Sequence, residues 1–282
     1  MSKISVFHSA KALQRATAGS KGLVGFVPTM GALHEGHLAL VRRAQRECER
    51  VVVSIFVNPT QFGPGEDFER YPRDLKKDCE LLASLGKPVD VFAPEAVEVY
   101  PSDFATRILV YGSLGRVLEA GLRPGHFDGV ATVVARLFGL VRPDRAYFGL
   151  KDYQQFRVIE RMTRDLGLPL ELVPCATVRE QDGLAMSSRN RYLSPAERSL
   201  APGLYRALNA TRVALGKGAS AAAAEKIGRE SLRRSGGFKL QYLSVADPMT
   251  LEPWKGTGRK GPKMVLAAAM LGSTRLIDNI KA

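Results

Sequence analysis

Residues 23–57 have the sequence LVGFVPTMGALHEGHLALVRRAQRECERVVVSIFV, and this stretch decides the fold class. Leu23 to Val27 is short and apolar, which is typical of a strand. Apolar residues then recur at three- and four-residue spacing from Leu38 to Cys48, which predicts a helix over about Gly36 to Glu49. Val51 to Val57 is a nearly unbroken apolar run, as in a parallel strand that is covered on both faces. The stretch therefore predicts a βαβ unit.

The turn between the first predicted strand and the helix carries two histidines. Pro28 and Gly31 interrupt regular structure there, and His34 and His37 lie three residues apart at the helix start, so their imidazoles share one side. A helix N-terminus favours an anion, because its backbone N–H groups are free and its dipole is positive. Three interpretations stay open from spacing alone: an anion site, two ligands of a metal site that needs a third, or structural histidines.

The composition is that of an ordinary globular protein. The chain has 282 residues, of which 45% are hydrophobic and 24% are charged, so it can bury a substantial core. No apolar run reaches membrane-spanning length, and the first residues lack the apolar segment of a secretory signal. Cys48, Cys79 and Cys175 are scattered and form no CxxC pair, which fits a reducing compartment. We expect a cytoplasmic protein without a membrane partner.

The net charge of +13 has several possible meanings. It could bind nucleic acid, attract small anionic substrates such as ATP, or only keep the surface soluble. The basic residues are spread along the chain, and no aromatic RNA-binding cluster, zinc-finger spacing or basic zipper is present in the sequence. We expect no nucleic-acid partner, although charge alone does not decide the point.

Further strands and helices alternate up to about residue 178. Continuous apolar segments are followed by helical patterns, and Gly86 and Gly167 stand where helix-terminating glycines belong. The predicted strands are Val89–Ala93, Arg145–Phe148 and Leu170–Val173, and the predicted helices are Leu75–Leu85, Val130–Val141 and Tyr153–Leu166. This alternation predicts an α/β fold with a Rossmann-like, doubly wound parallel sheet over residues 1–178.

Residues 179–282 predict a smaller C-terminal α+β domain. Ser194 to Glu197 has the pattern of a capping box with proline at the first helical position, and the helix that it opens is predicted to reach Leu215. An alanine-rich helix at 221–234 and strands at 240–246, 264–271 and 275–277 follow. The sequence GTGRKG at 256–261 matches the dinucleotide fingerprint, but it lies between apparent strands, so we interpret it as a hairpin loop.

Polar residues gather where the predicted strands end. In a parallel sheet these ends share one edge, where ligands bind. The segments are Pro28–Met30, Asn58–Gln61, Gly149–Asp152 and, after Val178, Met186–Asn190. Together they suit a triphosphate and a small polar acid. Structural roles remain open for several of them, since Asp152 and Gln155 fit a capping box, Asn58 a turn, Lys151 an exposed loop and Ser187–Ser188 a linker.

Several of these segments carry a family resemblance. PTMG with His34-Glu35-Gly36-His37 resembles the HxGH site of the nucleotidylyltransferase superfamily, and MSSRN at 186–190 resembles its second phosphate loop. Further blocks resemble the pantothenate synthetase (pantoate–β-alanine ligase) family: FVNPTQF at 56–62, YPR at 71–73, RPGHF at 123–127, KDYQQ at 151–155 and RLIDN at 275–279. Each block is modestly specific, but all occur in family order over nearly the whole chain.

The resemblance implies an ATP-dependent condensation of (R)-pantoate with β-alanine through a pantoyl-adenylate, releasing AMP and diphosphate. It also implies Mg²⁺ and a homodimer. The implied catalytic residues are His37, which acts as proton donor, His34 and Lys151. The residues implied to contact pantoate and β-alanine are Gln61 and Gln155. The implied ATP contacts are Met30, Gly31, Ala32, Leu33, His34, Glu35, Gly36, His37, Gly149, Leu150, Lys151, Asp152, Val178, Met186, Ser187, Ser188 and Arg189.

Some positions and alternatives stay unresolved by the sequence. Leu150 stands where the family usually has Glu or Gln, and Asp128 stands where Arg is frequent; Asp128 could retune local charge or cap a helix at Val130. Asp78 is one candidate for a Mg²⁺ ligand, but a position on a helix surface is favoured. The alternative functions are a nucleotidylyltransferase that leaves the nucleotide in its product, and a basic RNA-binding module on a similar scaffold.

Overall fold

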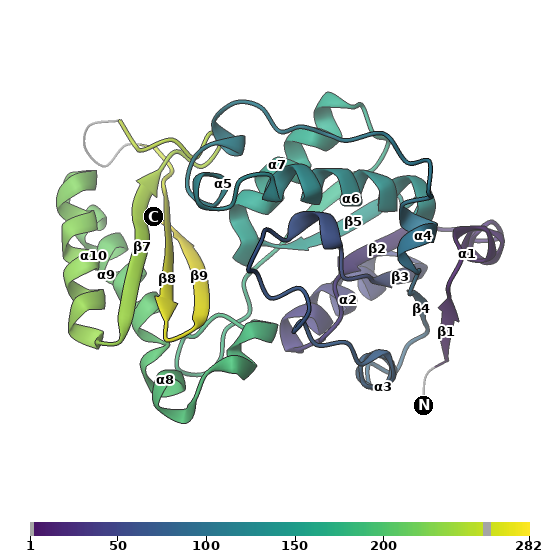
Figure 1. Ribbon diagram of the computed structural model, residues 1–282, viewed down its shortest axis with the longest axis horizontal. Coiled ribbons are helices and arrows are strands. Elements are labelled where there is room, and N and C mark those ends of the chain that lie inside the picture. The colour runs from purple at the N-terminus through teal and green to yellow at the C-terminus, as the bar shows by residue number, and fades with distance from the viewer. Residues whose placement is uncertain (1–2, 256–260) are drawn as a thin grey trace. The chain divides into compact units, whose positions relative to one another are not determined.

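The computed structural model describes residues 3–255 and 261–282, so residues 256–260 of the predicted hairpin loop lie outside the described residues. The chain folds into two compact units (Figure 1). The first contains the chain up to Gly115, Glu119–Leu150 and Gln155–Ala176; the second contains Arg116–Leu118, Lys151–Gln154 and the chain from Thr177 onward. Each unit has its own sheet.

The first unit is built on a parallel sheet, as predicted. Among the described residues its order is β1-β4-β3-β2-β5-β6, and every neighbouring pair is parallel. The strands are β1 Ile4–Phe7, β2 Val24–Thr29, β3 Arg50–Ile55, β4 Val89–Phe92, β5 Arg145–Gly149 and β6 Glu171–Cys175. The centre of β3 and all of β4 are buried, which explains why both strands consist mainly of large apolar residues. The buried polar residue of β4, Asp90, forms an ion pair with Arg50 of β3.

Helices connect these strands. They are α1 Ala10–Thr17, α2 Glu35–Glu47, α3 Leu75–Ala83, α4 Ala96–Val99, α5 Glu119–Leu122, α6 His126–Val141 and α7 Tyr153–Asp165, with 3₁₀ turns η1 Pro59–Gln61, η2 Ser113–Gly115 and η3 Leu150–Asp152. The fold class is therefore confirmed. The sequence patterns did not predict β1 and α1, because a four-residue strand that is only partly buried leaves little periodic signal.

The strand order places a switch point between β2 and β5. The chain proceeds from β2 to β3 and β4 on one side, and then returns to β5 on the other side of β2. Gly25 pairs with Arg145 and Phe26 with Ala146, so the carboxyl ends of these two strands leave the sheet at the same edge. Ligands of open α/β sheets bind at such a position. The loop after β2 and the segment after β5 are thus the first place to look for a site.

Helix α6 differs from its predicted start and corrects one prediction. It begins at His126, and its N-cap is Gly125 with φ of +77°, a conformation that favours glycine. Asp128 lies inside the first turn, where its Oδ1 accepts a hydrogen bond from Val110 N at 2.8 Å. An N-cap role for Asp128 is therefore wrong. Its carboxylate instead fastens the extended segment before η2 to the helix.

The second unit has an antiparallel sheet and helices. Within the described residues the sheet order is β7-β8-β9, formed by β7 Phe238–Ala246, β8 Met264–Leu271 and β9 Thr274–Lys281. The helices are α8 Pro195–Leu200, α9 Gly203–Gly216 and α10 Ala221–Ser235, preceded by the 3₁₀ turn η4 Ser188–Tyr192. The capping box at Ser194 and Glu197 is confirmed. The single helix to Leu215 is wrong: the chain breaks at Pro202, which has no N–H to continue the helix.

Each unit has its own apolar core. Leu208, Leu243 and Leu271 are fully buried in the second unit, and Phe26, Leu33 and Tyr147 in the first. In the part of the chain that the structure describes, no helix combines the length and the apolar character that crossing a bilayer demands.

Candidate functional site

The loop after β2 is held in an unusual backbone conformation by hydrogen bonds of Thr29. Thr29 Oγ1 donates to Ser54 O at 2.6 Å and accepts from Gly31 N at 3.1 Å. Gly31 has φ of +79° and Ala32 φ of +51°. A Cβ at Gly31 would come within 2.9 Å of Asp78 Oδ2, so glycine is required there by both conformation and space. This loop delivers the chain from the switch point to the start of α2.

Asp78 on α3 fixes the same loop from the other side. Its Oδ2 accepts from Ala32 N at 3.0 Å and its Oδ1 from Leu33 N at 2.8 Å. The residue is only 3% exposed, so the favoured position on a helix surface is wrong. Because each carboxylate oxygen binds a backbone N–H, Asp78 holds the loop in place. Buried carboxylates need such partners to offset their desolvation.

The two histidines meet at the start of α2. His34 is the N-cap, and its Nδ1 accepts from Gly36 N at 3.1 Å. The proton of a neutral His34 therefore sits on Nε2, where it can be donated to a ligand. The His34 and His37 ring centroids are 4.1 Å apart with 35° between the ring planes, so the predicted pairing on one side is confirmed. Two imidazoles beside a helix N-terminus form an environment suited to phosphate.

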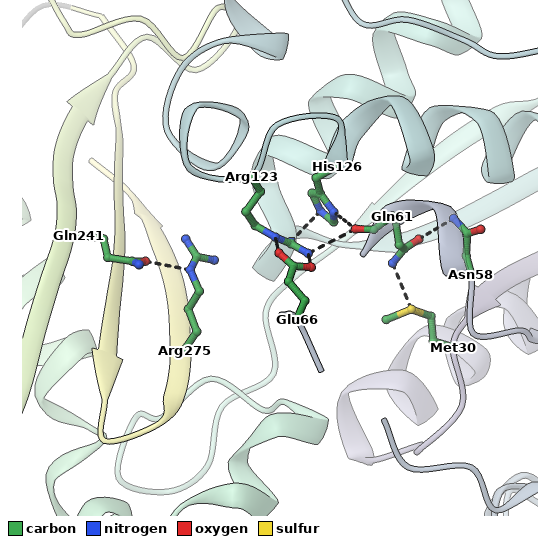
Figure 2. A network of polar contacts seen from close by, with 8 residues as sticks. All are labelled: Met30, Asn58, Gln61, Glu66, Arg123, His126, Gln241 and Arg275. Carbon is green, nitrogen blue, oxygen red and sulfur yellow. Dashed lines mark hydrogen bonds and ion pairs between the residues drawn. The ribbon is translucent and has the colours of Figure 1, made fainter. Parts of the chain in front are cut away.

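Gln61, after β3, has its side chain held in place (Figure 2). Its Nε2 donates to Met30 Sδ at 3.1 Å, and its Oε1 accepts from Asn58 Nδ2 at 3.2 Å. Asn58 is 1% exposed, and its Oδ1 accepts from Tyr100 OH at 2.8 Å and Thr60 Oγ1 at 3.0 Å. Asn58 is therefore more than a turn residue. It donates to Gln61, and Gln61 donates in turn to Met30, so two predicted binding residues belong to one network.

The Gln61 backbone is fixed by a second set of residues. Its carbonyl oxygen accepts from His126 Nδ1 at 2.8 Å, and His126 Nε2 lies 2.9 Å from Arg123 Nη1. Arg123 also forms a two-pronged ion pair with Glu66, with both N–O distances at 2.6 Å. Burial, reinforced by the neighbouring Arg123 charge, lowers the pKa of His126 to about 4. His126 is thus neutral, with its proton on Nδ1 and Nε2 accepting from the guanidinium.

This environment predicts a pH-dependent stability. The pKa of His126 is about 4 when folded and 6.5 when unperturbed, so the unfolded chain binds the proton more tightly. Stability is then complete above the unperturbed pKa and declines as the pH falls toward the folded one. We expect a loss of about 2 kcal/mol in unfolding free energy from this group between about pH 7 and about pH 5.

Urea unfolding at the two pH values tests this expectation. In His126→Gln the amide can still donate to the Gln61 carbonyl, but it does not titrate, so the decline should be smaller by the stated amount. Equal declines in the wild-type protein and in this variant would contradict the assignment.

Gly129 on α6 allows η1 to approach the helix closely. A Cβ there would lie 2.3 Å from Thr60 O and 2.8 Å from Gln61 Cα. Gly129→Ala should therefore displace Gln61, raise the KM for the substrate that Gln61 is predicted to contact, and destabilise the fold by about 1–3 kcal/mol, the usual range for overpacking. Gly139, on the same helix, has nothing within 4 Å of its Cβ position. Gly139→Ala is the matched control, expected to be neutral or stabilising by up to about 1 kcal/mol. Similar losses in both variants would show that the contact does not matter.

The second unit carries a further set of predicted residues. Lys151 and Asp152 lie in η3, with 3.4 Å between Lys151 Nζ and Asp152 Oδ1. Val178 O accepts from Met186 N at 3.0 Å, which closes a small hairpin just before the 186–189 segment. Ser187 caps η4, its Oγ accepting from Arg189 N at 3.3 Å, while Ser188 is buried. Ser187 and Ser188 thus belong to a defined turn and not to a linker.

The predicted residues therefore fall into two groups. Met30–His37, Gln61, Gly149, Leu150 and Gln155 belong to the first unit, and Lys151, Asp152, Val178 and Met186–Arg189 to the second. Sequence reasoning missed Asn58, Asp78, Arg123 and His126 as residues that hold the site. The sequence motifs that contain Asn58, Arg123 and His126 were recognised. The hydrogen-bond partners of these residues, however, are up to 71 residues away in the sequence.

Metal ligands do not gather in the described residues: no group of three or more His, Cys, Asp or Glu side chains there is arranged to hold a metal ion. The pairing of His34 with His37 thus has no third ligand within this part of the chain.

Comparison with known proteins connects this geometry to one family. The family model described as pantoate-beta-alanine ligase matches residues 3–281. A pantothenate synthetase of Thermus thermophilus is 56% identical over 260 residues, covering 92% of each chain, and one of Thermotoga petrophila is 50% identical over 283 residues, covering 99% of each.

Two solved structures agree in fold. A crystal structure of the pantothenate synthetase of Thermus thermophilus superposes with a TM-score of 0.93 at 53% identity over 98% of each chain. A pantoate-beta-alanine ligase from Francisella tularensis, complexed with beta-gamma ATP and beta-alanine, has a TM-score of 0.83 at 32% identity, covering 99% of this chain and 97% of that one.

Proposed function

The chain belongs to the pantoate–β-alanine ligase family and is an enzyme of pantothenate biosynthesis, and we propose that its two groups of strand-end residues bind the substrates and carry the reaction. The family match over residues 3–281 carries the assignment of the reaction. The proposal for the residues rests on the switch-point loop that places His34 and His37 together.

The proposed ATP site combines the loop after β2 with the segment after β5. His34 Nε2–H and His37 face the triphosphate at the N-terminus of α2, and Met30–Leu33, Glu35 and Gly36 contribute backbone contacts. The further residues that are proposed to contact ATP are Gly149 and Leu150 in the first unit, and Lys151, Asp152, Val178 and Met186–Arg189 in the second. Leu150 contacts the nucleotide through its backbone, so the departure from the usual Glu or Gln is tolerated. The structure from Francisella tularensis with ATP and β-alanine bound supports this assignment of ligands.

Gln61 and Gln155 are proposed to bind the carboxylic substrates. The Gln61 amide is held by Asn58 and Met30, and its carbonyl by His126, so it meets a substrate in one orientation. A side chain that is already held in one orientation lowers the entropy cost of bringing the two reactants into position. Gln61 contacts both pantoate and β-alanine, and Gln155 contacts pantoate.

The chemistry needs no protein nucleophile. In the first step the pantoate carboxylate attacks the α-phosphorus of ATP, forming pantoyl-adenylate while the bond to diphosphate breaks. His34, Lys151 and Arg189 donate hydrogen bonds to the phosphate oxygens, and His37 donates a proton to the charge that develops there. In the second step the neutral amine of β-alanine attacks the acyl carbon, AMP leaves with the bonding electrons, and the amine loses a proton.

Magnesium is proposed to enter with ATP as part of the substrate. Mg²⁺ in nucleotide sites typically takes phosphate oxygens and waters with one or two carboxylates. The oxygens of Asp78 are already bonded to the loop amides, which fits an ion held mainly by the phosphates.

The proposal extends to the organisation of the protein. Residues 1–178 are proposed as the domain that binds nucleotide and pantoate, and residues 179–282 as a lid that keeps water from the acyl-adenylate. The family resemblance further implies a homodimer, which sedimentation equilibrium can test. Free cysteines at 48, 79 and 175 support a reducing cytoplasm as its compartment.

Product analysis tests the reaction against its closest alternative. With ATP, pantoate and β-alanine the enzyme should yield pantothenate, AMP and diphosphate in equal amounts. A nucleotidylyltransferase would leave the nucleotide in its product instead. A stable adenylylated product with no free AMP after β-alanine is added would overturn the proposal.

A further inference from the structure

Lys151 is held in place by a residue far along the chain. Asn279 on β9 donates from Nδ2 to the Lys151 backbone carbonyl oxygen at 2.7 Å. Asn279 is only 7% exposed, so this hydrogen bond is sheltered from water. The neighbouring Tyr153 OH donates to Pro248 O at 3.0 Å. Although Lys151 follows β5 in sequence, these contacts make it part of the second unit.

Asn279 is itself fixed by a buried ion pair. Its backbone N donates to Asp278 Oδ1 at 2.8 Å, and its backbone O accepts from Arg179 Nη2 at 3.2 Å. Arg179 and Asp278 form a two-pronged pair with N–O distances of 2.6 and 2.9 Å. The Arg179 guanidinium also lies 4.1 Å from the centroid of the Tyr205 ring. A bidentate pair with this support has little freedom to rotate.

Arg179 also forms the base of the hairpin that precedes the 186–189 segment. It bridges to Ala185, and its Nη1 donates to Gly183 O at 3.1 Å. Met186 N then bonds to Val178 O. The hydrogen-bonded group of Arg179, Asp278 and Asn279 therefore links two elements. Asn279 contacts Lys151, and Arg179 contacts the hairpin that leads into Met186–Arg189.

We propose that Asn279 is a positioning residue that joins Lys151 to the 186–189 segment, so that both phosphate-binding elements are held as one rigid body. The inference rests on the proposed function of these two elements. In the reaction, the cations of Lys151 and Arg189 must reach the phosphates of one nucleotide in a fixed mutual geometry. In this proposal Asn279 acts through the Lys151 carbonyl oxygen, to which its side chain donates.

Two substitutions of Asn279 test the proposal. Asn279→Leu keeps the approximate shape and removes the donor, and Asn279→Ala removes the side chain. Either substitution should lower the kcat of pantoate-dependent ATP–diphosphate exchange by about 10- to 100-fold, because a misplacement of about 1 Å in a group that acts on the substrate can have an effect of this order. The KM for ATP should change by less than about 3-fold, since many other contacts hold the nucleotide. Thr274→Val, an isosteric change of a buried residue on the same strand, is the matched control and should leave both constants unaltered.

A double-mutant cycle separates positioning from general damage. If Asn279 acts through Lys151, Lys151→Ala combined with Asn279→Leu should exchange no more slowly than Lys151→Ala alone. The proposal would be overturned if the double variant were slower than Lys151→Ala by the full factor that Asn279→Leu causes alone. It would also be overturned if both Asn279 variants had the same kcat as Thr274→Val. Should one variant fail to fold, the other carries the test, with thermal unfolding as the check. A wild-type enzyme without pantoate-dependent exchange would instead contradict the proposed function itself.

Discussion

His37→Ala is expected to lower the rate of pantoyl-adenylate formation at least about 100-fold, because removing one preorganised donor from a developing phosphate charge has an effect of this order. His37 lies in the first turn of α2, with its ring beside that of His34. Alanine is a better helix former than histidine, so α2 should persist. The measurement is ATP–diphosphate exchange at saturating pantoate, with circular dichroism to confirm the fold.

His8→Ala is a suitable control for this experiment. His8 is exposed, and its Nδ1 lies 2.7 Å from Ala93 O. It belongs to neither of the two segments that are proposed to bind phosphate. Its exchange rate should equal that of the wild-type enzyme. Near-normal exchange in His37→Ala would remove His37 from the mechanism.

Asp78→Ala is expected to damage both stability and activity. The substitution leaves the buried N–H groups of Ala32 and Leu33 without their acceptor, at a cost of about 1–3 kcal/mol for each. Ala32 has a positive φ that is unfavourable for a residue with a Cβ, so the loop should relax once the carboxylate is gone. Since the loop leads into His34, exchange should fall by about 100-fold even in the protein that remains folded.

Asp74→Ala provides the matched comparison. Asp74 caps the same helix, its Oδ1 accepting from Lys77 N at 3.0 Å, but it does not touch the loop. Loss of this cap should cost about 1 kcal/mol and leave exchange unchanged. If urea unfolding and exchange gave the same losses for both variants, Asp78 would be a part of α3 only and not the anchor of the loop.

The parallel sheet could be predicted because burial leaves a local record. Val51 to Val53 of β3 and the apolar residues of β4 are buried and give a strong local strand signal, and Gly86 and Gly167 follow the ends of α3 and α7. The break at Pro202 has a local signal too, since proline cannot donate the hydrogen bond that a continuous helix needs. The helical patterns on either side of Pro202 conceal that signal in the sequence.

The residues that hold the site have no such record. Asp78 resembles a helix-surface carboxylate until the loop 45 residues earlier in the sequence is brought against it. Arg123 and His126 lie in a motif that was recognised, yet their action on the Gln61 carbonyl depends on contacts over more than 60 residues. Local spacing identifies residues that can meet substrate, whereas the residues that orient them are defined by tertiary structure.

Pantoate-dependent exchange of labelled diphosphate into ATP, measured without β-alanine, tests the central claim most directly. A ligase that forms pantoyl-adenylate should catalyse this exchange with ATP, Mg²⁺ and pantoate alone, and should release AMP only when β-alanine is added. Exchange that is absent until β-alanine is present, or that proceeds equally well without pantoate, would contradict the account.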